Sequence, residues 1–402
     1  MIRRRKKRLT DVHEIIIIMQ MLACNKNNNV RIIHHSNRKK ATMGLTFSLE
    51  KDGQFDQKLY DSYIASDDKI GDLTGKVVAI TGTTSGSLGY YVAKAAVAKK
   101  AKLVLLLNRE SSRSAKTEAD VKEGAGEETT VKTIPTDLLS FESVKKAAAV
   151  ISEISEKNGG LDVLCCNAGI MAMEDKRSVD GFDVQMQANH LSHYLLTKMC
   201  MSSLEKAAES RGEARIVFHS SSARYGEDLE SKYFEKSDPG TLGGDTSDAK
   251  QMFLGHKGSW TRYHQSKLAN SVFAMALHDK LQEKGSKVKA LSCDPGWAHS
   301  NLQTNSMKKG TMGGGFARIG SWIGHSAADG SLGCAMACFS QEANSGDFYM
   351  PDKTGGMRGA PVKSILEGKP LKSGGEKESL SAENKRIIMD CSEKAFGFNS
   401  TL

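Results

Sequence analysis

The stretch from Lys76 to Lys100 constrains the fold of this chain more than any other. It begins with an apolar, β-branched run, Lys76 to Thr81, which predicts a buried strand. A glycine-rich turn follows at once, and an alanine-rich segment from Tyr90 predicts a helix. Glycines in such a turn let the backbone approach a pyrophosphate, and the helix N-terminus offers free N–H groups and positive potential. The stretch therefore predicts the start of a dinucleotide-binding α/β fold.

Apolar strands alternate with amphipathic helices along most of the chain. The expected strands lie near Lys76, Lys102, Val131, Leu161, Arg215, Lys287 and Asp347. This alternation predicts a parallel sheet with helices on both faces, a Rossmann-type doubly wound α/β fold. With 402 residues, 39% of them hydrophobic, the chain can bury a large core. We expect a single domain over residues 71–398, after a basic extension over residues 1–70.

The net charge of +9 lies at the N-terminus. Residues 1–40 hold 11 Lys and Arg against two acids, and the remainder of the chain is neutral. We therefore expect no nucleic-acid binding by the folded part. The apolar run Ile15 to Leu22 is too short to span a bilayer and resembles the core of a targeting segment; a basic disordered tail is an equal alternative. A third interpretation starts the protein at Met43, where Met-Gly-Leu-Thr-Phe-Ser fits an N-myristoylation pattern.

The eight cysteines predict no disulfide framework. Cys165 and Cys166 end an expected strand, and Cys334 and Cys338 share one face of an expected helix. No metal-type Cys/His spacing stands out, so we expect no metal site. Reduced core cysteines are typical of an intracellular protein, whether cytoplasmic, organellar or membrane-associated.

The second expected strand bears on cofactor choice. It runs from Lys102 to Leu107 and ends in Asn108 and Arg109. An NAD-selective site of this fold places an acid there for the ribose 2′-hydroxyl. Arg109, with Arg113, is instead suited to a 2′-phosphate, so the sequence favours NADP(H) over NAD(H). The alternative is a solvated charge at the end of the strand.

Tyr263 and Lys267 form a candidate catalytic pair. Four residues apart on a predicted helix, their side chains share one face. A free tyrosine has a pKa near ~10, and a fixed cation beside it favours the phenolate. The pair therefore suits proton exchange with a reacting oxygen near neutral pH. The same spacing is also common on solvated helix faces.

Taken together, these motifs resemble the short-chain dehydrogenases and reductases from about Leu73 to Gly397. Besides the glycine-rich turn, the resemblance rests on Asn167-Ala168-Gly169, Asp180-Gly181-Phe182, Asn189-His190-Leu191-Ser192-His193, Ser220-Ser221-Ser222, Tyr263 to Asn270, Asp294-Pro295-Gly296 and Ser392-Glu393-Lys394. Within the family, the chain is most similar to the branch of the retinol dehydrogenases and WW-domain oxidoreductases.

The resemblance implies a catalytic tetrad of Asn189, Ser221, Tyr263 and Lys267. Tyr263 would exchange a proton with the substrate oxygen. Lys267 would lower the pKa of Tyr263 and hydrogen-bond the nicotinamide ribose. Ser221, rather than Ser220, would hold the carbonyl oxygen, and Asn189 would position a water for proton return.

The resemblance also assigns residues to the cofactor. They are Gly82, Ser85, Gly86 and Gly89 for the phosphates, Asp137 and Leu138 for the adenine edge, Asn167, Ala168 and Gly169 for the adenosine ribose, and Pro295, Gly296 and Ser300 for the nicotinamide amide. Gly86 and Gly89 are three positions apart where the family usually has two, so we expect a bulged loop with Gly89 kept at the helix start. Asp137 is alternatively a helix cap before Phe141.

The implied activity is hydride transfer between NADP(H) and a carbonyl or alcohol group. Glycines alternate with bulky apolar residues over residues 303–325, inside an expected substrate loop or lid at 297–330. Such a lid suits an apolar substrate that is retinoid-, steroid- or lipid-like, and it suits peripheral contact with a membrane surface equally well. The helices around Asn189 and Tyr263 form a homodimer face in many relatives of this kind.

Two other functions compete with this one. Light-dependent protochlorophyllide oxidoreductases share the Tyr/Lys pair and a long insertion before it, and here 41 residues separate Ser221 from Tyr263. A non-catalytic sensor would keep the dinucleotide fold as an interaction module. Such sensors usually lose tetrad residues, whereas all four are present in this chain.

Overall fold

The computed structural model describes residues 56–224, 228–245, 257–299, 324–364 and 374–397. The described residues from Gln57 onward belong to one compact unit. The basic leader, the Met43 start and residues 300–323 of the expected lid lie outside the described residues. Within the described ranges, no helix is both long and apolar enough to cross a membrane.

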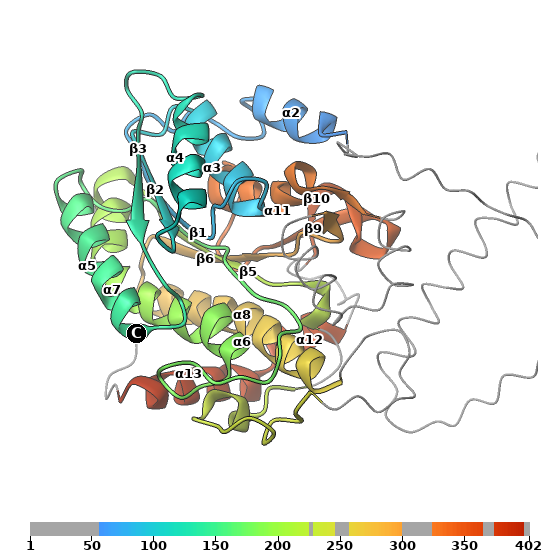
Figure 1. The fold of residues 1–402 in the computed structure, drawn as a ribbon. Helices are drawn as coiled ribbons and strands as arrows, with labels where there is room; N and C mark the ends of the chain where they lie inside the picture. Colours follow the sequence, from blue (N-terminus) through green and yellow to red (C-terminus); the bar gives the residue numbers. More distant parts are fainter. Residues whose placement is uncertain (1–55, 225–227, 246–256, 300–323, 365–373, 398–402) are drawn as a thin grey trace, which may run out of the picture. The chain divides into compact units, whose positions relative to one another are not determined.

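An eight-stranded sheet with the order β10-β9-β6-β5-β4-β1-β2-β3 forms the centre of this unit (Figure 1). Its strands are β1 (Val77–Thr81), β2 (Leu103–Asn108), β3 (Thr130–Pro135), β4 (Val163–Cys166), β5 (Ala214–His219), β6 (Val288–Cys293), β9 (Phe348–Lys353) and β10 (Arg358–Lys363). All seven strands expected from the sequence are confirmed, and the pairings among them are parallel. The antiparallel edge strand β10 was not predicted. A short two-stranded sheet of β7 (Ala298–His299) and β8 (His325–Ser326) was not predicted either.

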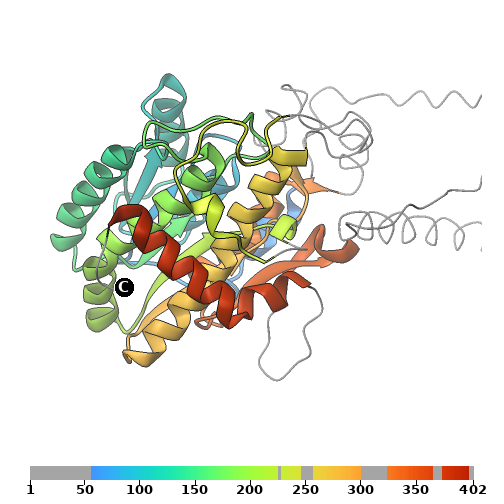
Figure 2. The same cartoon turned by 90° about the horizontal axis from the view of Figure 1, so that it is seen from below.

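Helices cover both faces of the sheet, as Figures 1 and 2 show. One face carries α2 (Lys58–Ala65), α3 (Leu88–Ala98), α4 (Ser112–Lys122) and α11 (Ala327–Phe339). The other carries α5 (Phe141–Glu156), α6 (Val184–Met186), α7 (Ser192–Arg211), α8 (Lys257–Glu283), α12 (Gly374–Leu380) and α13 (Ala382–Phe396). Each face has its own apolar core cluster, which explains why central strands such as β1 and β4 are buried at every position. The Rossmann-type doubly wound α/β fold is therefore confirmed.

The strand order reverses in the middle of the sheet, between β1 and β4. From β1 the chain crosses to β2 and β3 on one side, whereas β4, β5 and β6 build outward on the other. Ligands of doubly wound sheets bind where the order reverses, beyond the carboxyl ends of the strands. Here that point lies between Gly82, after β1, and Asn167, after β4.

Residues 57–70, which the sequence assigned to the N-terminal extension, include helix α2. Tyr60 of this helix is buried, and its hydroxyl donates a hydrogen bond to the Tyr91 carbonyl at 2.7 Å. Its backbone N–H donates to Asp329 at the start of α11. These contacts attach α2 to the helices on one face of the sheet.

Candidate active site

The turn after β1 brings the glycines of the first motif against the end of β4. Gly82 and Gly86 have positive φ angles of 72° and 77°, which glycine adopts without strain. A Cβ atom on Gly82 would lie 2.8 Å from Ala168 Cβ, and one on Gly89 would lie 2.5 Å from Asn167 Nδ2. The turn is therefore a close-packed cradle that side chains would fill, which fits a loop built to approach a pyrophosphate.

Helix α3 begins directly after this cradle. It starts at Leu88, so Gly89 lies in its first turn, and Ser87 caps it by accepting a hydrogen bond from Tyr90 N–H. Ser85, which the sequence assigned to the phosphates, is turned toward α4. Its hydroxyl donates to Asp120 at 2.9 Å, and its backbone N–H donates to Thr117. The extra residue between Gly86 and Gly89 thus leaves the start of α3 intact. Ser85 hydrogen-bonds to side chains of α4 instead of facing the turn.

The end of β2 supports the cradle and carries the candidate selectivity residue. The Asn108 side chain accepts a hydrogen bond from Thr83 N–H and donates one to Thr83 Oγ1. Arg109, the next residue, is exposed at the carboxyl end of the strand. This position places its guanidinium at the edge where the cofactor ribose is expected.

The Asn167-Ala168-Gly169 segment connects the cradle with the candidate catalytic residues. Asn167 donates to the Thr81 and Gly82 carbonyls, and Ala168 N–H donates to Thr81 Oγ1. A Cβ on Gly169 would lie 3.1 Å from Asn189 Oδ1 and 3.3 Å from Lys267 Nζ. The segment therefore lies between the glycine turn after β1 and the candidate catalytic residues Asn189 and Lys267.

Tyr263 and Ser221 meet inside the unit. Tyr263 lies near the N-terminal end of α8 and is only 4% exposed, and its hydroxyl lies beside that of the half-buried Ser221. Ser220, the alternative serine, donates instead to the Lys267 carbonyl at 2.8 Å. Burial raises the pKa of Tyr263 above its ordinary value, while the Ser221 hydrogen bond lowers it in part. Of the two serines, Ser221 is the one whose hydroxyl is beside the phenol.

Lys267 lies one turn further along α8 and is also buried. Its ammonium donates to the His219 carbonyl at 3.0 Å and lies 5.9 Å from the centre of the Tyr263 ring. Burial lowers the pKa of Lys267 to about 8. Burial therefore brings the pKa of this ammonium closer to neutral pH than that of a free lysine.

Asn189 lies in a short π-helix, Gln187–Leu191, between α6 and α7. Its side chain accepts a hydrogen bond from Ile170 N–H and donates to the Ile170 carbonyl and to Ser266 Oγ. These bonds connect the segment after β4 to α8. Single-turn π-helices inside α-helices often occur at functional sites.

The other predicted cofactor residues lie at neighbouring strand ends. Asp137 accepts a hydrogen bond from Leu139 N–H, and Ser140 rather than Asp137 caps α5. Leu138, also after β3, packs on the apolar core. Gly296 follows Pro295 after β6, and a Cβ there would lie 2.5 Å from the Met357 carbonyl. Ser300 lies outside the described residues.

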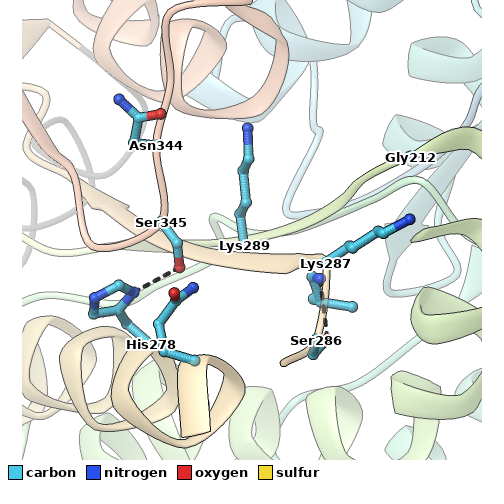
Figure 3. Close-up of a pocket in the computed structure, with 9 residues that line it drawn as sticks. Gly212, His278, Ser286, Lys287, Lys289, Asn344 and Ser345 are labelled. Carbon is cyan, nitrogen blue, oxygen red and sulfur yellow. Dashed lines mark hydrogen bonds between the residues drawn. The ribbon is translucent and has the colours of Figure 1, made fainter. Parts of the chain in front are cut away.

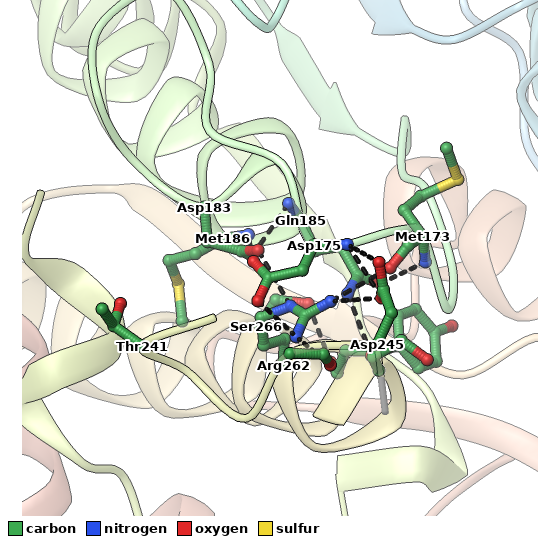
Figure 4. Close-up of polar contacts among 12 residues, drawn as sticks. Met173, Asp175, Asp183, Gln185, Met186, Thr241, Asp245, Arg262 and Ser266 are labelled. Atoms are coloured by element: carbon green, nitrogen blue, oxygen red, sulfur yellow. Dashed lines mark hydrogen bonds and ion pairs between the residues drawn. The ribbon is translucent and has the colours of Figure 1, made fainter. Parts of the chain in front are cut away.

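A buried arginine beside Tyr263 is a feature that the sequence analysis missed. Arg262 is fully buried, and its Nε lies 3.0 Å from Asp183 Oδ2 (Figure 4). Asp175 and Asp245 lie 3.6 and 3.5 Å from its guanidinium, which also donates to the Met173 carbonyl. In the sequence, only the position of Arg262 directly before Tyr263 indicated that it belongs to the site. The cluster joins the start of α8 to two preceding loops.

Apolar side chains pack against Tyr263. Trp260 packs against Tyr263 in a T-shaped arrangement with ring centres 5.8 Å apart. Met171 and Ala172 complete this small buried cluster, and Trp297 packs against it. The wall around the phenol is thus largely hydrophobic.

A separate surface pocket of about 380 Å³ lies at the amino ends of β5 and β6 (Figure 3). His278, Lys287 and Lys289 are among the residues that line it, and His278 pairs with Ser345 Oγ at 2.8 Å. The predicted site residues lie at the carboxyl ends of the same strands. This pocket is therefore distinct from the candidate active site.

Comparisons with known proteins agree with this arrangement. A model of the family described as short chain dehydrogenase matches residues 76–233. An uncharacterized oxidoreductase of Schizosaccharomyces pombe is 34% identical over 237 residues, covering 58% of this chain and 63% of that protein. A short-chain dehydrogenase/reductase of Armillaria gallica is 32% identical over 235 residues, 58% of this chain and 69% of its own length. A polyprenol dehydrogenase of Danio rerio is 29% identical over 234 residues, 58% of this chain and 64% of that protein.

A solved structure extends the likeness over most of the fold. An uncharacterized protein from Mycobacterium paratuberculosis is 25% identical with a TM-score of 0.58, covering 83% of this chain and 97% of that one. Of the sequence relatives, the chain spans less than two thirds of the Schizosaccharomyces pombe and Danio rerio proteins.

Proposed function

The chain belongs to the short-chain dehydrogenase/reductase family, and from this we propose that it is an NADP(H)-dependent oxidoreductase. It transfers hydride between nicotinamide and a carbonyl or alcohol group of an apolar substrate. The observation that carries the proposal is the buried Tyr263 phenol beside the Ser221 hydroxyl, with the Lys267 ammonium close to the phenol ring. A phenol held at a fixed serine hydroxyl is the arrangement that proton exchange with a bound carbonyl needs.

The cradle after β1 fits the cofactor that this reaction needs. Gly82, Gly86 and Gly89 would hold its pyrophosphate, because side chains at Gly82 and Gly89 would collide with the end of β4. Arg109 would pair with the 2′-phosphate. When bound, the nicotinamide supplies or accepts the hydride, and the chain supplies the geometry and the proton.

Each site residue then has a distinct task. Ser221 holds the substrate oxygen, and Tyr263 donates a proton to it in reduction or removes one in oxidation. Lys267 favours the phenolate form of Tyr263 through its charge. Asn189 holds Ile170 and Ser266 in place, so it positions the backbone around this pair.

Two observations support an apolar substrate that is retinoid-, steroid- or lipid-like. The cluster of Met171, Ala172, Trp260 and Tyr263 gives the reacting group hydrophobic surroundings. A relative from Danio rerio is named for a polyprenol, which is a long apolar alcohol. We propose a substrate of this chemical class, together with an intracellular location, peripheral membrane contact and a homodimer. Helix α8 is buried under α12 and α13 of the same chain, so the dimer face would lie elsewhere than on α8.

The test combines cofactor titration with turnover. NADPH and NADH binding is followed by fluorescence, and NADPH consumption is then measured with retinal, a steroid ketone, a long-chain aldehyde and a long isoprenoid aldehyde. Tyr263→Phe is expected to lower kcat by at least about 100-fold and to leave NADPH affinity unchanged. Tyr194→Phe is the matched control, because this buried tyrosine lies in the apolar core. Equal turnover by wild type and Tyr263→Phe would refute the proposed role.

A further inference from the structure

Four buried cysteines and one histidine meet next to the candidate active site. Cys165 is the second-to-last residue of β4, His219 ends β5, Cys293 ends β6, and Cys334 and Cys338 lie one turn apart on α11. All four cysteines are at most 2% exposed, and His219 is 5% exposed. We call these five residues the thiol cluster. The sequence analysis missed it because its members are scattered over more than 170 positions of the chain.

The ligand atoms of the thiol cluster lie close enough together to hold a metal ion. Cys165 Sγ lies 3.3 Å from Cys334 Sγ. The sulfur atoms of Cys165, Cys334 and Cys338 all lie within 4.8 Å of one another, and so do the ligand atoms of His219, Cys293 and Cys334. Sulfur atoms around a tetrahedral zinc ion are about 3.8 Å apart, as Zn–S bonds of about 2.3 Å require. Cys334 belongs to both groups, so it is the hub of the cluster.

The histidine is oriented for coordination by a hydrogen bond on its other side. Asn167 Nδ2 donates to the Thr81 and Gly82 carbonyls, which leaves Asn167 Oδ1 as the acceptor facing His219. His219 Nδ1 lies 3.0 Å from this oxygen and therefore carries the proton. Nε2 then has a free lone pair. Metal-binding histidines in proteins are held in the same way, by donating their second N–H to an oxygen.

We propose that the thiol cluster binds a soft divalent metal ion of the zinc class, through Cys334, the thiolates around it and Nε2 of His219. Each coordinating thiol loses its proton to solvent on binding, and no electron is transferred. The Lys267 ammonium, 3.0 Å from the His219 carbonyl, supplies positive charge near Cys293. Because the ligands are buried, the metal enters during folding.

The bound ion would act on the fold rather than on the reacting atoms. β4, β5 and β6 each run directly from the thiol cluster into a segment of the candidate site, namely Asn167 to Gly169, Ser220 to Ser222 and Asp294 to Gly296. A metal at the cluster would join these three strand ends to α11. We therefore expect metal loading to raise the thermal midpoint of the full chain.

The first test measures metal content and cobalt spectra of the full-length protein. The chain is produced in medium with added zinc or cobalt and purified under reducing conditions. We expect about one metal ion per chain, with thiolate-to-cobalt charge-transfer absorption in the cobalt form. Cys334→Ser should weaken metal affinity by at least about tenfold. Cys200→Ser is the matched control, since Cys200 is an equally buried cysteine on α7 outside the cluster.

The second test needs only the wild-type protein, in case Cys334→Ser does not fold. X-ray absorption of the zinc form should show a first coordination shell dominated by sulfur. A shell of nitrogen and oxygen only, the absence of bound metal, or a charge-transfer band retained in folded Cys334→Ser would each overturn the proposal. So would a mass two hydrogens lower in the reduced-buffer preparation, because it would show a disulfide in the cluster instead of a metal.

Discussion

Burial, more than ion pairing, sets the protonation of the candidate catalytic side chains. It raises the pKa of Tyr263 and lowers that of Lys267 to about 8. The sequence suggested that the cation would make the phenol acidic, but both groups lie in the same low-polarity surroundings, which disfavour each charged form. Of the groups around the phenol, the Ser221 hydroxyl is the one that lowers the pKa of Tyr263, against burial and the Asp294 carboxylate.

Lys267→Met is expected to stabilise the fold while abolishing turnover. The unfolded chain holds the lysine proton up to about pH 10.5, whereas the folded chain releases it near pH 8. Below pH 8 the fold thus buries a charge, and this penalty disappears as pH rises from 8 to 10.5. After allowance for the lost hydrogen bond to His219, the free energy of unfolding at pH 7 should rise by about 2 kcal/mol. Urea unfolding at several pH values measures it.

The pH dependence of the difference in unfolding free energy between Lys267→Met and wild type provides the control. The gain of Lys267→Met over wild type should shrink between pH 8 and pH 10.5. Lys284→Met, at an exposed position after α8, should show no such trend. A gain that stays constant across this range would mean that the buried charge is not its cause.

Arg109→Ala is expected to change cofactor preference. The side chain is exposed at the end of β2, where a 2′-phosphate would lie, and a charged hydrogen bond contributes about 1.5–3 kcal/mol. NADPH affinity should therefore fall by about 10- to 100-fold, and NADH affinity should change little. Fluorescence titration with both nucleotides measures it, with exposed Lys146→Ala on α5 as the control. An equal loss for both nucleotides would contradict the assignment.

The sequence predicted the elements whose local pattern is strong and missed those built by long-range contacts. The parallel strands β1 to β6 are rich in β-branched or apolar residues, and β9 begins with the apolar run Phe-Tyr-Met before its proline, so each was predictable. Strand β10 reads Arg-Gly-Ala-Pro-Val-Lys, with the glycine and proline that usually argue against a strand, and it forms only by antiparallel pairing with β9 at the sheet edge. The thiol cluster and the carboxylates around Arg262 were missed for the same reason, because their partners come from distant segments.

The loops before α8 depend on Arg262. Removing this guanidinium would leave Asp183 almost fully buried without its partner, and breaking a buried ion pair in this way costs about 3–5 kcal/mol. Arg262→Met should therefore lower the thermal midpoint markedly and reduce kcat through displacement of Tyr263. Arg386→Met on α13 is matched, since Arg386 also pairs with carboxylates but is 62% exposed. It should change stability by less than about 1 kcal/mol.

If Arg262→Met and Arg386→Met lost similar amounts of thermal stability, burial would not be the reason that Arg262 matters. The separation is sharp because the two arginines have the same chemistry and comparable numbers of carboxylate partners. Only their solvation differs. Thermal unfolding followed by circular dichroism, together with NADPH turnover, provides both readouts.

The extent of the folded unit is open to a direct test with two shortened chains. One begins at Gln57 and keeps α2, and the other begins at Gly71, where the sequence placed the domain boundary. The compact unit begins at Gln57, and Tyr60 and Ile70 are both buried within it. The chain from Gln57 keeps these contacts and is therefore the reference for the chain from Gly71.

The chain from Gly71 should be clearly less stable. It loses the buried ring of Tyr60, the hydrogen bond from Tyr60 to the Tyr91 carbonyl and the bond to Asp329. Truncation of one buried aromatic side chain alone costs about 3–5 kcal/mol. Removal of α2 also uncovers α3, and α3 begins at the cradle for the cofactor. NADPH affinity should therefore fall as well. Equal melting temperatures for the two shortened chains would show that α2 contributes nothing and that the domain begins at residue 71.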